Sequence, residues 1–323
     1  MWYKILNKHP KISVILPIYK EPNEYIQSSI ESILSQTYSN FELILAVDTG
    51  VDSPEFDRVY KVLEQYLKDD RVNLLINEQN IGLPMTLNKS IKIAKGEYIA
   101  RMDADDIALP ERLEIQMEHM EKNPELDLIG TKVFYINQEG KITGESKSLD
   151  NNDLLKRLFS GINPLCHPTW LFKKEVWEAV NGYRNITTIE DYDFLCRLIL
   201  KGFNLGIINR PLLKYRIDYR VGRISKKRTM QLALTLAIAK EFRKGKILSD
   251  EKVDKILNKK INPVIIYLDS ISQALDNLLM SISPQLHYYL KWLVYFISPY
   301  KARHILEAIY YMHFGNFNKN ATG

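Results

Sequence analysis

The sequence has little cysteine and no long apolar run. Its two cysteines, Cys166 and Cys196, form neither a Cys-x-x-Cys pair nor a zinc-type spacing with any histidine. A disulfide framework is therefore excluded, which favours a reducing compartment. No uninterrupted apolar stretch is long enough to span a membrane, and residues 1–10 lack the apolar region of a signal peptide. We therefore expect a cytoplasmic protein.

Several common functional motifs are also absent. Neither GxGxxG nor GxxxxGK[ST] occurs, so the signatures of a Rossmann dinucleotide site and a P-loop are missing. His-Glu-x-x-His and Gly-x-Ser-x-Gly are absent too, which removes the common metalloprotease and hydrolase motifs. The net charge of +5 is too mild to indicate a nucleic-acid partner, and we expect none. The 46% hydrophobic and 26% charged content is that of an ordinary globular protein.

Strand and helix patterns alternate over the first 110 residues. The β-type runs are Ile12–Leu16, Phe41–Val47, Val72–Ile76 and Glu97–Met102, and the helical patterns between them are Glu24–Ser35, Phe56–Leu67 and Leu83–Ala94. This alternation predicts an α/β fold whose parallel sheet has helices on both faces. We expect Pro17 to end the first strand and Lys95-Gly96 to close the third helix as a C-cap.

The rhythm changes after Pro110. Residues 111–224 predict mixed α+β structure, with a helix over Asp191–Lys201 and a short strand at Leu205–Ile208. Residues 225–323 predict a helical C-terminal region. Its stretch His287–Tyr311 mixes aromatic and basic residues, which suits peripheral contact with a membrane surface. A helical hairpin docked on the catalytic domain or on a partner subunit explains the same pattern, so oligomeric state stays open.

An acidic cluster, Asp103-Ala104-Asp105-Asp106, follows the buried strand after Gly96. Ligands of open α/β sheets bind at the carboxyl ends of the strands, where this cluster lies. Like charges this close must be solvated, protonated or neutralised by a cation, and carboxylates suit Mg²⁺ or Mn²⁺. An EF-hand fails, since Ile107 and Ala108 occupy its ligand and glycine positions. A solvated surface loop is the alternative to a metal–nucleotide site.

Several segments together resemble glycosyltransferase family 2, the inverting GT-A enzymes. They are ISVILPIYKEPNEYIQSSIESILSQTY from Ile12, FELILAVD ending at Asp48, NIGL from Asn80, GEYIARMDADDIALPERL from Gly96 and EDYDFLCRL from Glu190. The resemblance covers about Lys11 to Arg216. It implies a Rossmann-like mixed sheet flanked by helices, with a catalytic domain over residues 1–224. Within it, residues 11–110 would bind the nucleotide-sugar and residues 111–224 the acceptor. The segment EYIARMDADD, from Glu97, is similar to that of bacterial enzymes that extend lipopolysaccharide or capsular chains.

The resemblance implies a metal and a donor site. Asp105 matches the direct ligand of Mn²⁺ or Mg²⁺, and Asp103 matches a residue shared between ribose and metal. Tyr19 would stack on the uracil of a UDP-sugar and Asp48 would hydrogen-bond that base; both are also ordinary turn residues. The further donor-side candidates are Pro17, Glu21, Asn80, Asn88 and Arg101.

This chain departs from the family pattern at three places. The family often carries Asp-Asp-Gly-Ser where this chain has Val47-Asp48-Thr49-Gly50, so only the second aspartate is kept. Many relatives carry Arg before the asparagine of their third motif, where this chain has Leu87, so that contact must come from Lys89 or Arg101. Asp218 replaces the histidine of a Tyr-Arg-x-His motif. A basic segment around it would cover the donor diphosphate or grip the phosphates of a lipid-linked acceptor, or it forms a solvated face. Its members are Arg216, Arg220, Arg223, Lys226, Lys227 and Arg228.

The acceptor side contains the candidate general base. Asp191 would take the proton of the acceptor hydroxyl, while a capping box from Thr188 at a helix start is the alternative. Glu190 would hold the acceptor sugar. His167 and Trp170 match a segment near the acceptor, although a structural histidine and a core tryptophan are equally good interpretations.

The expected activity is metal-dependent, inverting transfer of a hexose or N-acetylhexosamine. The donor would be a UDP-sugar and the acceptor a hydroxyl of a growing bacterial capsule, lipopolysaccharide or exopolysaccharide. A sugar-nucleotide nucleotidyltransferase would need a Gly-rich loop after the first strand, and residues 17–23 have none. A non-catalytic nucleotide-sugar-binding assembly subunit would not need Asp103, Asp105 and Asp191 intact.

Overall fold

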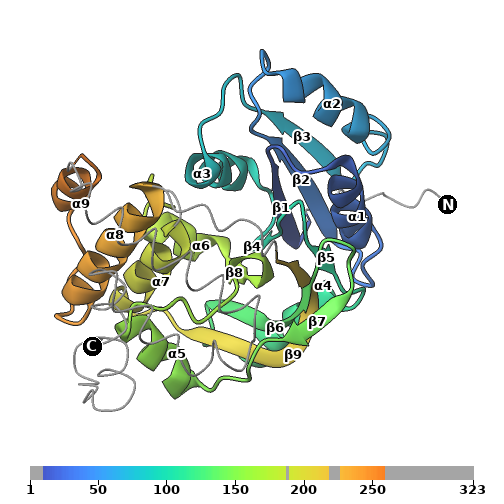
Figure 1. Ribbon diagram of the computed structural model, residues 1–323. Helices are drawn as coiled ribbons and strands as arrows, with labels where there is room; N and C mark the ends of the chain where they lie inside the picture. Colours follow the sequence, from blue (N-terminus) through green and yellow to red (C-terminus); the bar gives the residue numbers. More distant parts are fainter. Residues whose placement is uncertain (1–9, 187–188, 218–225, 259–323) are drawn as a thin grey trace, which may run out of the picture. The chain divides into compact units, whose positions relative to one another are not determined.

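The computed structural model describes residues 10–186, 189–217 and 226–258, which fall into two compact units (Figure 1). The first, the sheet unit, comprises the described residues of Met1–Asn151, Leu165–Glu190 and Phe203–Ile217. The second, the helical unit, comprises those of Asn152–Pro164, Asp191–Gly202 and Asp218–Gly323. Each unit is described by itself, and the predicted domain boundary after residue 224 stays a prediction.

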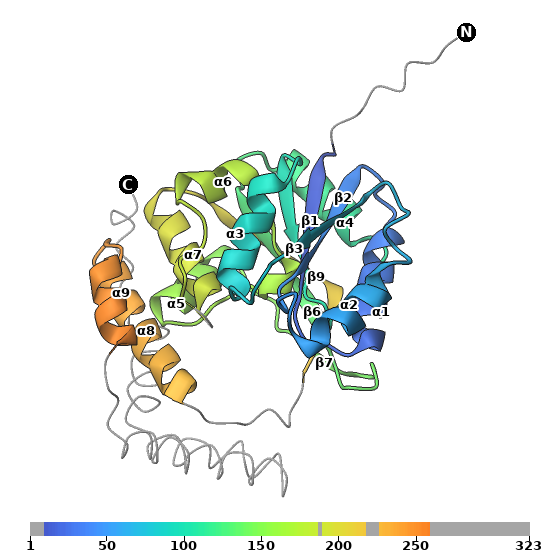
Figure 2. The same cartoon turned by 90° about the horizontal axis from the view of Figure 1, so that it is seen from above.

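The first half of the sheet unit alternates strands and helices, as the sequence pattern predicts. Its strands are β1 (Ile12–Ile18), β2 (Phe41–Val47), β3 (Val72–Ile76) and β4 (Tyr98–Arg101), and its helices are α1 (Asn23–Leu34), α2 (Pro54–Leu63) and α3 (Leu83–Ile93). The strands pair in parallel in the order β3-β2-β1-β4. Helices α1 and α2 cover one face of this sheet and α3 the other (Figure 2).

The pleat of the strands explains why both faces carry helices. Ile12, Val14 and Leu16 point to one face, where they share a core with Ile26 of α1 and Val59 of α2. The residues between them point to the opposite face, which α3 covers. Because every residue of β1 and β2 is buried, these strands appear in the sequence as continuous apolar runs.

Two boundary predictions were wrong, for different physical reasons. Pro17 does not end β1, which runs on to Ile18. Pairing with β4 stops at Ile15, so the missing N–H of Pro17 leaves no ladder hydrogen bond unmade on that side. Gly96 is not a C-cap either, since α3 ends at Ala94 in an extended conformation. A Cβ at Gly96 would lie 2.5 Å from the backbone nitrogen of Ser13, so glycine permits the close approach to β1.

The second half of the sheet unit makes the sheet mixed. Its elements are β5 (Ile107–Ala108), α4 (Arg112–Lys122), β6 (Leu128–Ile136), β7 (Ile142–Glu145), a 3₁₀ turn (His167–Thr169), β8 (Leu171–Lys173), α6 (Lys174–Ala179) and β9 (Leu205–Arg216). The full strand order is β3-β2-β1-β4-β8-β6-β9-β5, with β7 beside β6. The pairs β4–β8, β8–β6 and β9–β5 are antiparallel.

The strand predicted at Leu205–Ile208 is much longer than expected. Its pairing with β6 shifts register after Ile208 and resumes at Pro211. The Asn-Arg-Pro sequence that resembles a strand end is therefore a bulge, at which Asn209 exchanges hydrogen bonds of 2.8 and 2.9 Å with the backbone of Leu149. Beyond it the strand continues to Arg216, which lies beside the acidic cluster.

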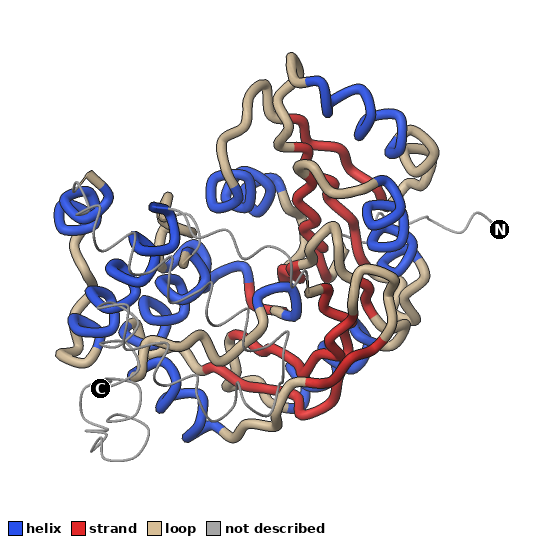
Figure 3. The backbone as a smooth tube through the Cα atoms, viewed as in Figure 1, coloured by secondary structure: helices blue, strands red, loops and turns tan. Residues whose placement is uncertain are grey.

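The sheet curls around the acidic cluster (Figure 3). Strands β4 and β5 are separated by β8, β6 and β9 in the sheet order, yet only residues 102–106 join them. This connection is closed as a turn by the Asp106 N–H, which donates to the Asp103 carbonyl at 3.3 Å. Because a closed turn cannot span several strand spacings of about 4.8 Å each, the far edge of the sheet must bend back toward β4.

The helical unit contains α5 (Asn151–Phe159), α7 (Glu190–Leu200), α8 (Lys226–Phe242) and α9 (Asp250–Leu257). The rings of Phe159 and Phe242 lie 4.9 Å apart, and the Tyr192 hydroxyl donates to the Leu158 carbonyl at 2.6 Å. The stretch His287–Tyr311, for which the sequence suggested a membrane or partner contact, lies outside the described residues. Within the described residues, no helix combines the length and the apolar character that crossing a membrane requires.

Candidate active site

The acidic cluster forms the loop between β4 and β5. Carboxylate oxygens of Asp103, Asp105 and Asp106 lie within 4.8 Å of one another. The loop is anchored to α1 by the Ser29 hydroxyl, which donates to the Asp103 carbonyl at 2.8 Å. Hard carboxylate oxygens converging in this way match the donor set of Mg²⁺ or Mn²⁺.

The electrostatics of this loop favour a bound cation. Burial, followed by the charges of Asp103 and Glu21, raises the pKa of Asp105 to about 7. Burial, followed by the charges of Asp103 and Asp105, raises the pKa of Asp106 well above its ordinary value. The buried Oδ2 of Asp106 finds no hydrogen-bond partner within the described part of the chain. A divalent cation would relieve both the repulsion and the unsatisfied oxygen, so the residues present fit a metal site.

Arg101 lies in the interior of the protein beside the acidic loop, not at its exposed surface. It is buried and ion-paired with Asp103. Burial by itself lowers the pKa of Arg101, but the charge and hydrogen bond of Asp103, together with the charge of Asp106, raise it overall. Arg112 donates to the Arg101 carbonyl at 2.8 Å from the far side. Because Arg101 is buried and paired, the structure favours a role in balancing the charge of Asp103 over the predicted contact of Arg101 with a nucleotide.

Asp48 organises the loop that follows β3. Its carboxylate accepts hydrogen bonds of 2.8–2.9 Å from the Asn77 side chain and from the backbone N–H groups of Ile81 and Gly82. The Asn80 side chain donates to the Asp48 carbonyl at 2.8 Å. Asp48 therefore holds residues 80–82 against the end of β2, and the uracil contact predicted for it stays a prediction.

Lys89 is an exposed basic residue beside the hydrogen-bonded pair of Asp48 and Asn77, called the Asp48–Asn77 cluster below. Its Nζ donates at 2.8 Å to the Asn77 side chain, which itself donates to Asp48. The sequence offered Lys89 and Arg101 as replacements for the arginine that Leu87 displaces. Because Arg101 is buried and paired, the structure favours Lys89.

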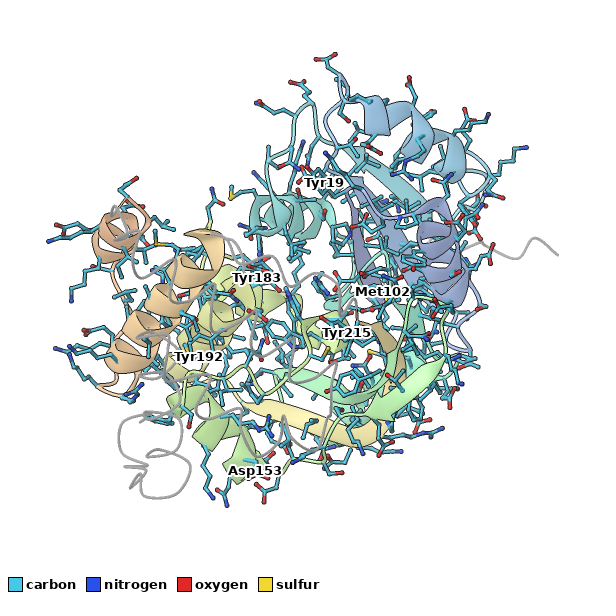
Figure 4. The ribbon with its side chains drawn as sticks, in the orientation of Figure 1. Tyr19, Met102, Asp153, Tyr183, Tyr192 and Tyr215 are labelled. Carbon is cyan, nitrogen blue, oxygen red and sulfur yellow. The ribbon has the colours of Figure 1, made fainter. Side chains whose placement is uncertain are left out.

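Tyr19 and Glu21 follow the carboxyl end of β1. The Tyr19 side chain is 41% exposed (Figure 4), so its ring is available for stacking rather than packed in the turn. The Tyr19 N–H donates to a Glu21 carboxylate oxygen at 2.7 Å. Burial, with a contribution from the charge of Asp103, raises the pKa of Glu21, so Glu21 lies in the field of the acidic loop.

Asn88 has a structural role that its predicted donor contact does not account for. Its Oδ1 accepts from the Trp177 indole at 2.9 Å and from the Tyr183 N–H at 2.8 Å, and its Nδ2 donates to the Tyr183 carbonyl at 2.7 Å. These bonds hold the turn after α6, where Asn181 and Gly182 adopt positive φ. The structure therefore favours Asn88 as an anchor for this turn.

His167 and Trp170 are core residues in the sheet unit. Trp170 is fully buried and donates to the Leu165 carbonyl at 3.4 Å. His167 lies 4.4 Å from the Trp170 ring and 3.0 Å from the Tyr183 hydroxyl, and burial lowers its pKa well below the ordinary range. A ring with no exposed face cannot stack on a sugar, so core packing is the interpretation that the structure favours for Trp170.

Asp191 lies at the start of α7, in the helical unit. Its Oδ1 accepts from the Tyr192 N–H and its Oδ2 from the Asn163 side chain at 2.5 Å. The helix predicted here is present, whereas Thr188, the proposed cap, lies outside the described residues. Glu190 is buried. The catalytic role of Asp191 and the acceptor role of Glu190 stay predictions.

Two family models match this sequence. The family model described as Glycosyl transferase family 2 matches residues 13–180, which is more than half of the chain. The chain belongs to glycosyltransferase family 2. A second model, Glycosyl transferase family group 2, matches residues 98–312 of this glycosyltransferase.

Relatives of this glycosyltransferase include enzymes named for O-antigen and amylovoran biosynthesis. An uncharacterized glycosyltransferase of Methanocaldococcus jannaschii is 35% identical over 69% of this chain and 76% of its own. The O-antigen biosynthesis glycosyltransferase WbnJ of Escherichia coli is 37% identical over 64% of this chain and 79% of its own. The amylovoran biosynthesis glycosyltransferase AmsE of Erwinia amylovora is 30% identical over 63% and 75%.

Solved structures establish the GT-A fold. S. aureus TarS 1–349 in complex with UDP-GlcNAc aligns with a TM-score of 0.59 at 15% identity, over 94% of this chain and 90% of that one. The mannosyltransferase PcManGT of Pyrobaculum calidifontis, in complex with GDP-Man and Mn²⁺, aligns with a TM-score of 0.56 at 16% identity, over 96% and 89%. The predicted mixed sheet flanked by helices is thereby confirmed.

Sequence reasoning about this glycosyltransferase missed two partners of the candidate site. Asn163 binds the Asp191 carboxylate, and no sequence motif marks it. Arg216 was grouped with a basic segment, but it binds the acidic loop. In Figure 4 the labelled Met102 and Tyr215 mark where β4 and β9 reach that loop. Asp218, Arg220 and Arg223 lie outside the described residues.

Proposed function

We propose that this glycosyltransferase transfers a hexose or N-acetylhexosamine from a UDP-sugar, with inversion, to a hydroxyl of a growing bacterial surface glycan. The observation that carries the proposal is the convergence of the Asp103, Asp105 and Asp106 carboxylates at the carboxyl end of β4. WbnJ and AmsE are named for O-antigen and amylovoran biosynthesis, which supports a surface glycan as the product.

The donor in this proposal is a UDP-sugar. The TarS structures hold UDP and UDP-GlcNAc, while the PcManGT structure holds GDP-Man, so both nucleotides occur on this fold. The exposed Tyr19 ring offers a face on which the base can stack. Lys89, attached to the Asp48–Asn77 cluster, supplies a positive charge at the same edge of the sheet.

Asp105 and Asp103 would hold Mn²⁺ or Mg²⁺ in this proposal. When bound, the cation offsets the charge that develops on the departing diphosphate. The ion pair with Arg101 holds the Asp103 carboxylate in place. The fully buried Arg112 supports Arg101 from behind through the Arg101 carbonyl.

Asp191 would act as general base. As the acceptor hydroxyl oxygen bonds to the anomeric carbon, the bond from that carbon to the diphosphate breaks and the hydroxyl proton passes to the Asp191 carboxylate. The hydrogen bonds from Asn163 and from the Tyr192 N–H set the orientation of that carboxylate. Inversion follows because attack and departure occur on opposite faces of the sugar.

A donor screen tests the proposal. The full chain is incubated with UDP- and GDP-sugars, with Mn²⁺ or with EDTA, and nucleoside diphosphate release is measured. We expect Mn²⁺-dependent UDP release from at least one UDP-sugar. Formation of a sugar nucleotide from UTP and a sugar phosphate would indicate the nucleotidyltransferase alternative. Binding of UDP-sugars without any turnover, in the presence of candidate glycan acceptors, would indicate a non-catalytic subunit.

Paired variants test the base. Asp191→Asn should abolish transfer while leaving UDP binding intact, since it removes the proton acceptor only. Asp250→Asn is the matched control, because Asp250 also lies in the first turn of a helix of the helical unit. Normal transfer by Asp191→Asn would show that another group takes the proton.

A further inference from the structure

Arg216, the last residue of β9, makes an unusual set of contacts with the acidic loop. Its Nε donates to the Asp105 carbonyl at 2.8 Å, and its backbone N–H donates to the Asp106 carboxylate at 2.8 Å. Its Nη1 donates to the carbonyls of Asn137 and Gln138 at 2.9 and 2.8 Å. Side chain and backbone of one residue thus hold both the loop and the tip of the β6–β7 hairpin.

Helix α1 supplies the third side of this arrangement. The guanidinium carbon of Arg216 lies 3.9 Å from the centre of the Tyr25 ring, a cation–π distance. The Tyr25 hydroxyl donates at 3.0 Å to the Gln138 carbonyl, which Arg216 also binds. A planar fork with several N–H donors is needed to reach both segments at once, and lysine does not have it.

The acidic loop needs such an anchor. Its carboxylates are close together and repel one another, so without fixed attachments the loop would open. The Ser29 hydroxyl holds the Asp103 carbonyl at one end, and Arg216 holds Asp105 and Asp106 at the other. The positive charge of Arg216 also lies beside the loop, although its guanidinium N–H groups donate to backbone carbonyls rather than to the carboxylates.

We propose that Arg216 is a positioning residue that holds the Asp103–Asp106 loop in its metal-binding geometry through the Asp105 carbonyl and the Asp106 carboxylate. This inference rests on the metal site of the proposed function. It assigns Arg216 a role different from the grip on phosphates that the sequence suggested for the basic residues around it.

Binding of Mn²⁺ alone, followed by electron paramagnetic resonance of the free ion, tests the role. Residues that orient metal ligands typically change metal affinity by 10–100-fold when they are lost. We expect Arg216→Gln to weaken Mn²⁺ binding by about that factor. Arg216→Lys should lie between Arg216→Gln and the wild type, since it keeps the charge but loses the fork. If Arg216→Gln does not fold, the Mn²⁺ affinity of Arg216→Lys tests the positioning role in its place.

Turnover separates positioning from contact with substrate. If Arg216 acts through the loop, the Mn²⁺ concentration for half-maximal UDP release rises by a similar factor. The rate at saturating Mn²⁺ should recover to near the wild-type value, because Arg216 itself touches no reacting atom. A rate that stays low at every Mn²⁺ concentration would overturn the positioning role.

Arg71 offers a matched control. Like that of Arg216, its guanidinium binds a backbone carbonyl, that of Leu34, and lies near an aromatic ring, 5.0 Å from that of Phe41; it also binds the Asp69 carboxylate. Arg71 precedes β3, so it lies at the amino ends of the parallel strands, whereas the acidic loop lies at their carboxyl ends. Arg71→Gln should lower the unfolding temperature while Mn²⁺ affinity stays at the wild-type value.

The outcomes distinguish this inference from the proposed function. Wild-type Mn²⁺ affinity in folded Arg216→Gln would overturn the inference alone. An equal loss of affinity in Arg71→Gln would do the same, since it would reflect general destabilisation. Absence of Mn²⁺ binding by the wild type would overturn the proposed metal site, and the inference with it.

Discussion

Replacing Asp105 by asparagine should stabilise the metal-free protein, and the gain should grow with pH. Asparagine resembles the neutral, protonated carboxyl in size and charge. Burial and the charges of Asp103 and Glu21 raise the pKa of Asp105 from 3.8 to about 7 in the folded protein. Ionised Asp105 is therefore unfavourable in the folded state, and the substitution removes that unfavourable charge.

The size of the effect follows from proton linkage. Below pH 3.8 the Asp105 carboxyl is protonated in both states, so it contributes no pH dependence. Between pH 3.8 and about 7 the folded protein keeps a proton that the unfolded chain has lost. The stability of the wild type then falls by up to about 1.4 kcal/mol per pH unit. Because these carboxylates titrate together, we expect the advantage of Asp105→Asn to grow by about 1–3 kcal/mol from pH 5 to pH 8.

Urea unfolding of both proteins, at about pH 5 and about pH 8 and in EDTA, measures this difference. Asp70→Asn, a substitution at an exposed position, is the control and should show no such growth. An advantage of Asp105→Asn that stays constant between the two pH values would refute the reasoning. Adding Mn²⁺ should reverse the order, because a cation stabilises only the protein that binds it. Equal stabilisation of Asp105→Asn by Mn²⁺ would show that Asp105 is not a ligand.

Two further substitutions test residues whose roles the structure revised. Gly96→Ala should lower the free energy of unfolding by about 1–3 kcal/mol, because its Cβ would lie 2.5 Å from the Ser13 nitrogen; unchanged stability in urea would contradict this close approach. Asn88→Ala leaves the Trp177 indole and the Tyr183 N–H without their acceptor, at about 1–3 kcal/mol for each unpaired donor. Calorimetry should find UDP affinity unchanged in that variant, and a large loss of affinity without loss of stability would restore the predicted donor contact.

Most of the structure of residues 11–110 follows from local pattern. β2 and β3 have the bounds that their apolar runs predict; α1 differs from prediction by one residue at each end, and α3 by one residue at its C-terminal end. Continuous apolar strands and helices with one apolar face determine such elements without long-range information. The same holds for the acidic cluster, whose residue types and place after a buried strand indicate a cation.

The elements that the sequence did not predict depend on distant partners. Strand β5 exists because Ile107 and Ala108 pair with β9, more than a hundred residues later in the chain. The exposed β7 has no apolar alternation and pairs only with the neighbouring β6. The extension of β9 to Arg216 needs the bulge that its register with β6 imposes. None of these features has a local signal.

The sequence by itself determined the family, the alternating half of the fold and the residue types of the acidic loop. Tertiary structure alone decided how those side chains are used. Trp170 lies in the core, Asn88 holds a turn, Arg101 neutralises Asp103, and Arg216 attaches the acidic loop to a hairpin and a helix. The physical reason is that a motif specifies which groups are present, whereas burial and hydrogen-bond partners, which set pKa and availability, depend on segments far away in the chain.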